Sequence, residues 1–365
     1  MNKNVRALQT NIQGEIVKTK EPVSVWLMVT LLTTLVLFFG TVSMKVNANE
    51  QNEMKEKETR IIVICAHPDD AELTTGGTTI LLTHLGFKIK YVSLTNGNKG
   101  HHQGTKNEIA IRRYNETREV AKRLNCEYEV LNNEDGELEA TLKNRMEVIK
   151  LIREWKADIV ITHPSYDYHP DHRNTSLLVQ DAAFLVSVPK ILPEVPALEV
   201  NPLFLYTRGR YTNPQKPSPD IVVDITPVVR EKADAIDAHE SQIYEWLPWI
   251  NRSNEVIPET REGRLEHVLN VYVLKRGEVK SEDLPAVEKW YGSDAKAVKV
   301  IEAFEICEFG RKVTDRDIRE LFQLFPNRSE NRRNPNNEHS PCHLKSDSPA
   351  GYLSCVCSIN EKYYL

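Results

Sequence analysis

Cysteine is scarce in this sequence, and its spacing matches no metal-binding or disulfide framework. The 365 residues contain six cysteines, and the pair Cys355 and Cys357 lies one residue too close for a CxxC motif. Charge of one sign is also lacking, because the net charge is only -5 and there is no basic excess for binding nucleic acid. These absences argue against a zinc finger, a disulfide-rich scaffold and a nucleic-acid partner.

A glycine-rich phosphate-binding loop is missing as well. Gly76 and Gly77 follow the first predicted strand without forming a GxGxxG motif, and the carboxylates of Asp69 and Asp70 precede them. Carboxylates at this place would repel a pyrophosphate. The sequence therefore argues against nucleotide binding, although its alternating pattern invites that interpretation.

Long apolar runs are confined to one segment near the start of the chain. Residues Val23–Val42 are uncharged, follow a stretch that carries lysine and arginine, and precede Val46-Asn47-Ala48, which resembles a signal-peptidase site. The length suits a membrane span and the triplet favours cleavage, so residues 1–48 are expected to be a signal peptide or an N-terminal membrane anchor. Both alternatives predict export, because the basic flank stays in the cytoplasm.

The rest of the chain divides into three parts. Residues 49–59 are a charged linker, and residues 60–326 carry the regular pattern of a folded domain. The composition, 40% hydrophobic and 27% charged, is that of an ordinary globular protein. From residue 327 to 365 the sequence turns to Asn, Ser, Arg and Pro, which predicts a disordered tail or an artefact of cloning or reading frame.

Strand-like and helical runs alternate through the first half of this domain. The predicted strands are Arg60–Ala66, Lys88–Thr95, Glu127–Leu131, Asp158–Thr162, Leu203–Thr207 and Asp220–Asp224, and the predicted helices are Gly76–Leu85, Asn107–Leu124, Thr141–Trp155, Thr175–Val186 and Pro227–Glu245. The alternation predicts an α/β fold with a Rossmann-like, mostly parallel sheet flanked by helices. We expect the strand order 3-2-1-4-5.

Two polar motifs follow the first and fourth predicted strands. They are Ala66-His67-Pro68-Asp69-Asp70 and His169-Pro170-Asp171-His172. In the expected order these strands are neighbours, and ligands bind outside the carboxyl ends of strands where the order reverses. The topology therefore predicts that His67, Asp70 and His172 meet in space.

The residue types in these motifs predict a hydrolytic metal site. His67, His172 and Asp70 form a two-histidine, one-carboxylate set that leaves a position open for water, which suits zinc and also ferrous iron or cobalt. Asp69 lies on the other side of the turn, where it can take the proton of water and hand it to a leaving amine. His169 is expected to face the developing oxyanion, with Asp171 fixing its tautomer.

These motifs have two other interpretations. Polar residues in surface loops are common, but two such clusters after matched strands make coincidence the weaker explanation. A structural metal site would close its shell with four protein ligands. The surplus carboxylates and His169 speak against that closed shell.

At these residues the chain resembles the LmbE/PIG-L family of zinc-dependent N-deacetylases. That family carries Ala-His-Pro-Asp-Asp-Glu early in the sequence and His-Pro-Asp-His about a hundred residues later. The resemblance extends from about Arg60 to Phe325, and its further matches are Thr95-Asn96-Gly97, Arg113-Tyr114-Asn115-Glu116, Asp135-Gly136 and Asp167 to Arg173. One departure is that Ala71 occupies the sixth position of the first motif and Glu72 follows it.

The resemblance implies roles for individual residues. His67, Asp70 and His172 would bind zinc, and Asp69 would be the general base. His169 with Asp171 would support the oxyanion. Arg113 and Asp135 would touch the substrate.

The family resemblance also implies the reaction. We expect a hydrolase that removes the acetyl group from an N-acetylglucosamine-type conjugate, a small-molecule partner whose attached group the motifs leave open. The alternatives are a metal-dependent amidase acting on a non-sugar conjugate and a carbohydrate-binding relative without turnover. The presence of Asp69 speaks against the latter, because a binding relic has no need of a base.

Aromatic and histidine side chains near the expected site allow two interpretations. His101 and His102 line the pocket mouth or lie in a solvated loop. Trp246 and Trp249 stack on a sugar ring or, as the commoner case, pack in a core or interface. His239 is expected to be a structural histidine.

Overall fold

The computed structural model describes residues 58–211 and 216–326. The predicted leader and tail, and most of the linker, lie outside these ranges. Within them, no helix combines the length and the apolar character needed to cross a membrane.

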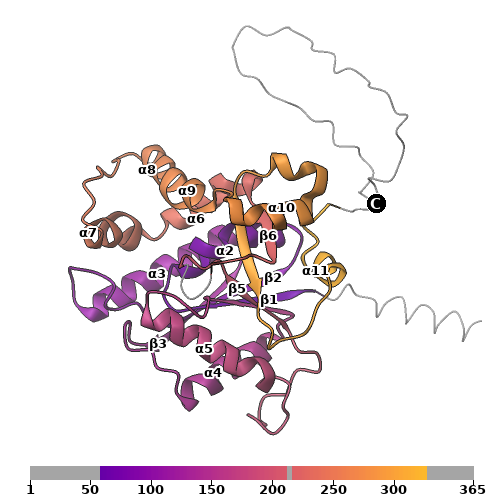
Figure 1. The fold of residues 1–365 in the computed structure, drawn as a ribbon. Helices are drawn as coiled ribbons and strands as arrows, with labels where there is room; N and C mark the ends of the chain where they lie inside the picture. Colours follow the sequence, from indigo (N-terminus) through magenta and orange to yellow (C-terminus); the bar gives the residue numbers. More distant parts are fainter. Residues whose placement is uncertain (1–57, 212–215, 327–365) are drawn as a thin grey trace, which may run out of the picture.

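The centre of the molecule is one seven-stranded sheet with the order β3-β2-β1-β4-β5-β7-β6 (Figure 1). The strands are β1 (Arg60–Cys65), β2 (Lys88–Thr95), β3 (Glu127–Asn133), β4 (Ile159–Thr162), β5 (Leu203–Thr207), β6 (Ile221–Asp224) and β7 (Ile301–Ile306). Neighbours from β3 to β5 pair in parallel, whereas β7 runs antiparallel to both β5 and β6. The predicted α/β fold and the order 3-2-1-4-5 are confirmed.

Helices cover both faces of the sheet (Figure 1). The α-helices are α2 (Asp70–His84), α3 (Lys106–Leu124), α4 (Leu142–Trp155), α5 (Pro170–Leu185), α6 (Val229–Asp237), α7 (Leu247–Ile250), α8 (Arg261–Val268), α9 (Lys275–Gly277), α10 (Leu284–Tyr291) and α11 (Asp315–Phe322). The π-helical turns η2 (Ser241–Trp246) and η3 (Leu269–Leu274) link α6 to α7 and α8 to α9.

Strand β1 shows why the sheet is buried on both faces. Its side chains alternate, so that Ile61 and Val63 pack with α2 and α3 in one core, whereas Ile62 and Ile64 pack with α4 and α5 in the other. A parallel strand covered on both sides reads as a continuous apolar run. This explains why the run was recognisable in the sequence.

Helices α2 and α5 begin earlier than predicted, at Asp70 and Pro170. The second motif therefore forms the start of α5, and the first motif is the turn that leads into α2, whose first residue is Asp70. Pro170 suits this place because the first helical residue needs no N–H partner, and His169 caps the helix by accepting from the Asp171 N–H. Carboxylates in the first turn are favoured by the helix dipole.

The second half differs from the prediction in two places. The helix predicted over Pro227–Glu245 is divided, since α6 ends at Asp237 and η2 follows. Strand β7 was not predicted, because its buried run is interrupted by Glu302. That carboxylate accepts from Lys232 at 2.6 Å and from the Gly77 N–H at 2.8 Å, which makes its burial tolerable.

Helix α2 approaches the segment before α6 closely at one glycine. A Cβ added to Gly77 would lie 2.6 Å from the buried side chain of Ile225. We expect Gly77→Ala to lower the free energy of unfolding by about 1–3 kcal/mol through overpacking. Its neighbour Gly76 is the control, since a Cβ there meets only the flexible Lys232 side chain at 3.4 Å. Chemical denaturation measures both variants, and equal stabilities would contradict the close approach.

Candidate metal and catalytic site

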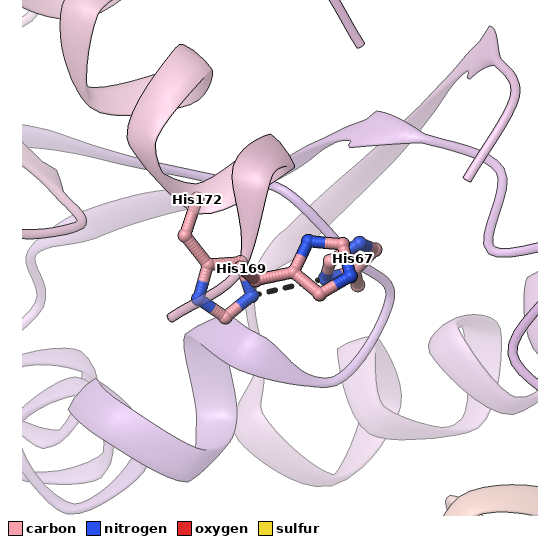
Figure 2. Close-up of side chains that lie close together, drawn as sticks. All are labelled: His67, His169 and His172. Atoms are coloured by element: carbon pink, nitrogen blue, oxygen red, sulfur yellow. Dashed lines mark hydrogen bonds between the residues drawn. The ribbon is translucent and has the colours of Figure 1, made fainter. Parts of the chain in front are cut away.

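The two motifs meet at the carboxyl ends of β1 and β4. Figure 2 shows the imidazoles of His67, His169 and His172 close together, with His67 entering from the turn after β1 and the other two from the start of α5. His67 Nδ1 and His172 Nε2 are 3.1 Å apart, although the residues are 105 positions apart in the chain.

Asp70 completes a triangle with these two nitrogens. Its Oδ2 lies 3.3 Å from His67 Nδ1 and 3.5 Å from His172 Nε2. Ligands placed about 2.0–2.1 Å from a tetrahedral zinc ion are about 3.3 Å apart. The predicted ligand atoms therefore have the spacing that a metal ion requires.

The two histidines are oriented by carboxylates. His172 Nδ1 lies 2.9 Å from Asp167 Oδ1, and His67 Nε2 lies 3.2 Å from Asp171 Oδ2. A carboxylate accepts, so each of these ring nitrogens carries the proton and the opposite nitrogen directs its lone pair into the triangle. Asp167 stood within a motif of the sequence, but its role was not predicted.

His163 is a further residue that the sequence analysis missed. It follows β4 directly, and together with Asp70 and His172 it forms one of the groups able to hold a metal. Its Nε2, however, already accepts the Ala66 N–H at 3.0 Å, and its ring stacks on His172 at a centroid distance of 4.1 Å. These contacts assign it to positioning His172. Its place after a strand was the signal that would have found it.

The backbone of Asp171, rather than its carboxylate, holds the tautomer of His169. Its carboxylate accepts from the Gly136 N–H at 2.7 Å and the Leu138 N–H at 3.2 Å, and it orients His67. The backbone N–H of Asp171 donates to His169 Nδ1 instead. His169 therefore presents its Nε2–H, and burial together with His67 and His172 lowers the pKa of His169, which favours this neutral form.

Arg113 and Asp135 line the same cavity but are already engaged with protein groups. Arg113 Nη2 donates to Asp69 Oδ1 at 2.9 Å and to the Pro68 carbonyl at 3.2 Å. Asp135 lies 3.3 Å from His67 Nε2 and 3.6 Å from Arg113 Nη1. The structure thus places both behind the predicted base and ligand, and their contact with substrate stays a prediction.

The turn after β2 makes room for Arg113. Gly97 has a φ of +66°, and its carbonyl accepts from Arg113 Nη1 at 3.1 Å. A Cβ at Gly97 would come within 2.5 Å of that nitrogen. Glycine at this position therefore lets Arg113 reach Asp69.

The two adjacent aspartates have opposite electrostatic settings. Burial raises the pKa of Asp69, Arg113 opposes this shift, and Asp70 adds to it. Burial also acts on Asp70, but His172 and His163 outweigh it and hold the pKa of Asp70 well below its usual range. Asp70 therefore stays ionised, as a metal ligand must, whereas Asp69 takes up a proton more readily, as a general base must. This is the division of roles predicted from the motif.

A cavity of about 540 Å³ opens over these groups. Trp246 lines it, and Trp249 stacks on Trp246 at 5.4 Å and on His102 at 4.7 Å. Trp249 is 40% exposed, so this aromatic stack belongs to the rim rather than to a core. The volume lies within the usual range for small-molecule pockets.

The shifted acidic residue of the first motif has a buried partner beneath the site. Glu72 and His239 are both fully buried and form a hydrogen-bonded pair. Burial lowers the pKa of His239, but Glu72 and Glu116 outweigh it and raise that pKa to about 10. His239 is thus a structural histidine, as expected.

The fold and the histidine–carboxylate centre define an α/β protein with a candidate metal site at its topological switch point. A family model described as PIG-L: GlcNAc-PI de-N-acetylase matches residues 62–183. Diacetylchitobiose deacetylase of Thermococcus kodakarensis is 31% identical over 210 residues, which cover 54% of this chain and 78% of that relative. The chain belongs to the PIG-L, or LmbE-like, family.

Two further comparisons agree with this membership. The protein named probable N-acetyl-alpha-D-glucosaminyl L-malate deacetylase 2 of Bacillus cereus is 28% identical over 51% of this chain and 84% of its own length. The solved structure of N,N'-diacetylchitobiose deacetylase from Pyrococcus horikoshii, complexed with its inhibitor MPG, superposes with a TM-score of 0.53. It is 24% identical and covers 70% of this chain and 85% of its own, so this likeness concerns the fold.

Removing the carboxylate behind His172 is expected to weaken metal binding. We expect Asp167→Ala to lower the affinity for zinc about 10–100-fold, and Asp167→Asn to lower it less because the amide oxygen still accepts. Competition with a chromophoric chelator measures both. Asp181→Ala on α5 is the matched control, since its surface pair with Arg145 lies outside the site. Unchanged affinity in Asp167→Ala would remove the orienting role.

The Glu72–His239 pair is expected to make stability depend on pH. Because the pKa of His239 is raised from 6.5 to about 10, its contribution is fully present below pH 6.5 and is lost as the pH rises towards 10. We expect His239→Gln to cost about 3–5 kcal/mol at pH 6.5 and progressively less at higher pH. Denaturation of wild type and variant across this range measures the difference. A difference that stays constant across this range would contradict the pairing.

Proposed function

We propose that this protein is a metal-dependent N-deacetylase acting on an N-acetylated amino sugar. The observation that carries the proposal is the triangle of His67 Nδ1, Asp70 Oδ2 and His172 Nε2, with Asp69 on the same turn. The relatives named as deacetylases of diacetylchitobiose and of N-acetylglucosaminyl malate support the substrate class. Zinc is the metal we favour, and ferrous iron or cobalt would suit the same ligands.

A divalent ion held by the triangle would supply Lewis acidity and make water a stronger nucleophile near neutral pH. Asp69, held by Arg113, accepts the proton of the attacking water. His169 Nε2–H donates to the carbonyl oxygen as negative charge develops on it. The carbon–nitrogen bond then breaks, Asp69 returns the proton to the amine, and acetate and a free amino sugar leave.

The aromatic rim offers a place for the sugar ring. Trp246 lines the cavity next to the catalytic groups, and stacking on indole faces suits the apolar face of a pyranose. The half-buried His169 lines the same cavity, as do Asp69 and the ligand residues. An acetamide reaching inward from a ring held at Trp246 would therefore meet the base and the oxyanion donor.

We also propose that the protein acts outside the cytoplasm, cleaved from its leader or anchored to the membrane by it. The uncharged run Val23–Val42 and its basic flank support this proposal. Cell fractionation with mass measurement of the mature N-terminus tests it. Recovery of the uncleaved chain in the cytoplasm would refute it.

Acetate release tests the reaction directly. The zinc-loaded full chain is assayed with N-acetylglucosamine, diacetylchitobiose and N-acetylglucosaminyl malate. We expect Asp69→Asn to retain zinc and lose about 10²–10⁴-fold in kcat, because the amide still accepts from Arg113 but takes no proton. We expect His172→Ala to lose the metal, and Asp181→Ala to behave as wild type.

Other outcomes would redirect the proposal. Zinc binding at one ion per chain without acetate release from any sugar would overturn the sugar deacetylase and favour an amidase of non-sugar conjugates. Sugar binding without turnover would favour a carbohydrate-binding relative. Full activity in Asp69→Asn would remove Asp69 as the base.

A further inference from the structure

A second cavity of about 410 Å³ adjoins the catalytic cavity. It lies between the first part of α2, β7 and the end of η3. Arg210 and Arg276 line both cavities, so one ligand can extend from one into the other. No residue of the two site motifs lines this cavity. The nearest lining residues, Leu73 and Thr74, follow the first motif in α2.

The wall of this second cavity is strongly basic. Its cationic residues are Arg208, Arg210, Lys232, Lys275, Arg276 and Lys280, and its single carboxylate is Glu302. Glu302 is neutralised by Lys232 and also accepts the N–H groups of Gly77 and Thr78. Its negative charge is therefore already paired and does not compensate the other cations of the wall.

Among the described residues, four of these cations lack a carboxylate partner and a fifth is only partly satisfied. Arg208 Nη2 pairs with Asp283 at 2.9 Å, but its Nη1 is buried without a hydrogen-bond partner. In the described ranges, 58–211 and 216–326, no carboxylate lies within 4.0 Å of the charged groups of Arg210, Lys275, Arg276 or Lys280. Uncompensated positive charge gathered around a cavity is an arrangement that an anion stabilises.

Arg276 shows the crowding most clearly. Its guanidinium lies over the Tyr272 ring at 5.0 Å, which fixes it between the two cavities. Burial and the neighbouring Arg210 lower the pKa of Arg276 to about 10, so it remains charged at neutral pH in an unfavourable setting. A guanidinium held in this way is suited to paired hydrogen bonds with phosphate or carboxylate oxygens.

We propose that this basic cavity binds an anionic group, a phosphate or carboxylate, carried by the molecule whose acetamide enters the catalytic cavity. The inference rests on the proposed function and narrows its substrate to acidic N-acetylated sugars. A cavity of this size takes a substituent of a small molecule, and the net charge of -5 shows no overall basic excess of the kind that a polyanion would require.

The first test compares matched substrates on the zinc-loaded full chain. Acetate release is measured for N-acetylglucosamine, its 1-phosphate and 6-phosphate, and N-acetylmuramic acid, which carries a carboxylate. We expect kcat/KM for at least one acidic sugar to exceed that of N-acetylglucosamine about tenfold or more. The acidic sugar that is preferred distinguishes phosphate from carboxylate.

Variants locate the effect. Arg276→Gln and Lys275→Gln are each expected to lower the acidic-to-neutral ratio of kcat/KM about tenfold or more. Lys143→Gln, an exposed lysine on α4, is the matched control and should leave the ratio unchanged. Because Arg276 also packs on Tyr272, Lys275 provides a variant at an exposed position whose loss does not disturb that packing.

A binding measurement separates this inference from the proposed function. Titration calorimetry of wild type and Arg276→Gln uses glucosamine and glucosamine 6-phosphate. Tighter binding of the phosphate that Arg276→Gln abolishes, without turnover of any sugar, would keep the anion site and refute the deacetylase. Turnover of neutral sugars with no preference for acidic ones, and equal binding of both probes, would overturn the anion site and keep the deacetylase.

Discussion

The parallel pairing of β1 with β4 is the constraint on which the site depends. Ile64 stands opposite Thr162 in this pairing, so both strands end at the same level and both polypeptide turns leave the sheet side by side. A shift by one residue would turn every side chain of β1 to the other face. Since both faces of β1 are packed, the two cores hold the register and with it the 3.1 Å approach of His67 to His172.

The site concentrates buried carboxylates and satisfies them by different means. Asp171 accepts hydrogen bonds from two backbone N–H groups, Asp69 accepts from Arg113, and Glu72 accepts from His239. Asp70 accepts the His67 N–H at 2.7 Å and otherwise faces imidazole nitrogens. The Asp70 carboxylate is thus a buried negative charge surrounded by histidine nitrogens, and such a charge favours binding of a cation. This agrees with the metal site proposed from the geometry.

The sequence was sufficient for the parts of the fold that topology determines. The parallel order and the meeting of His67, Asp70 and His172 follow from buried strands that end in polar residues. The sequence could not predict roles that depend on which ring nitrogen faces which carboxylate. The contacts of the Asp171 carboxylate with His67 and of Asp167 with His172 were therefore not predicted.

Long side chains and buried charges account for the other differences. Arg113 reaches from α3 back to Asp69, a direction that sequence spacing does not reveal. Strand β7 escaped prediction because Glu302 interrupts its apolar run, and the partner that makes Glu302 tolerable, Lys232, lies 70 positions away. Pairings over such separations become visible only in the folded molecule.

The position of β7 has a consequence for the order of assembly. It lies between β5 and β6 in the sheet, yet in the chain it comes well after both, at Ile301–Ile306. Among the strands that the structure describes, β6 pairs with β7 alone, so during synthesis the sheet can grow only as far as β5. Until the last strand arrives, β5 presents an open edge whose unpaired backbone groups are available to other chains, and this interval is the one in which a nascent chain is most exposed to misassembly.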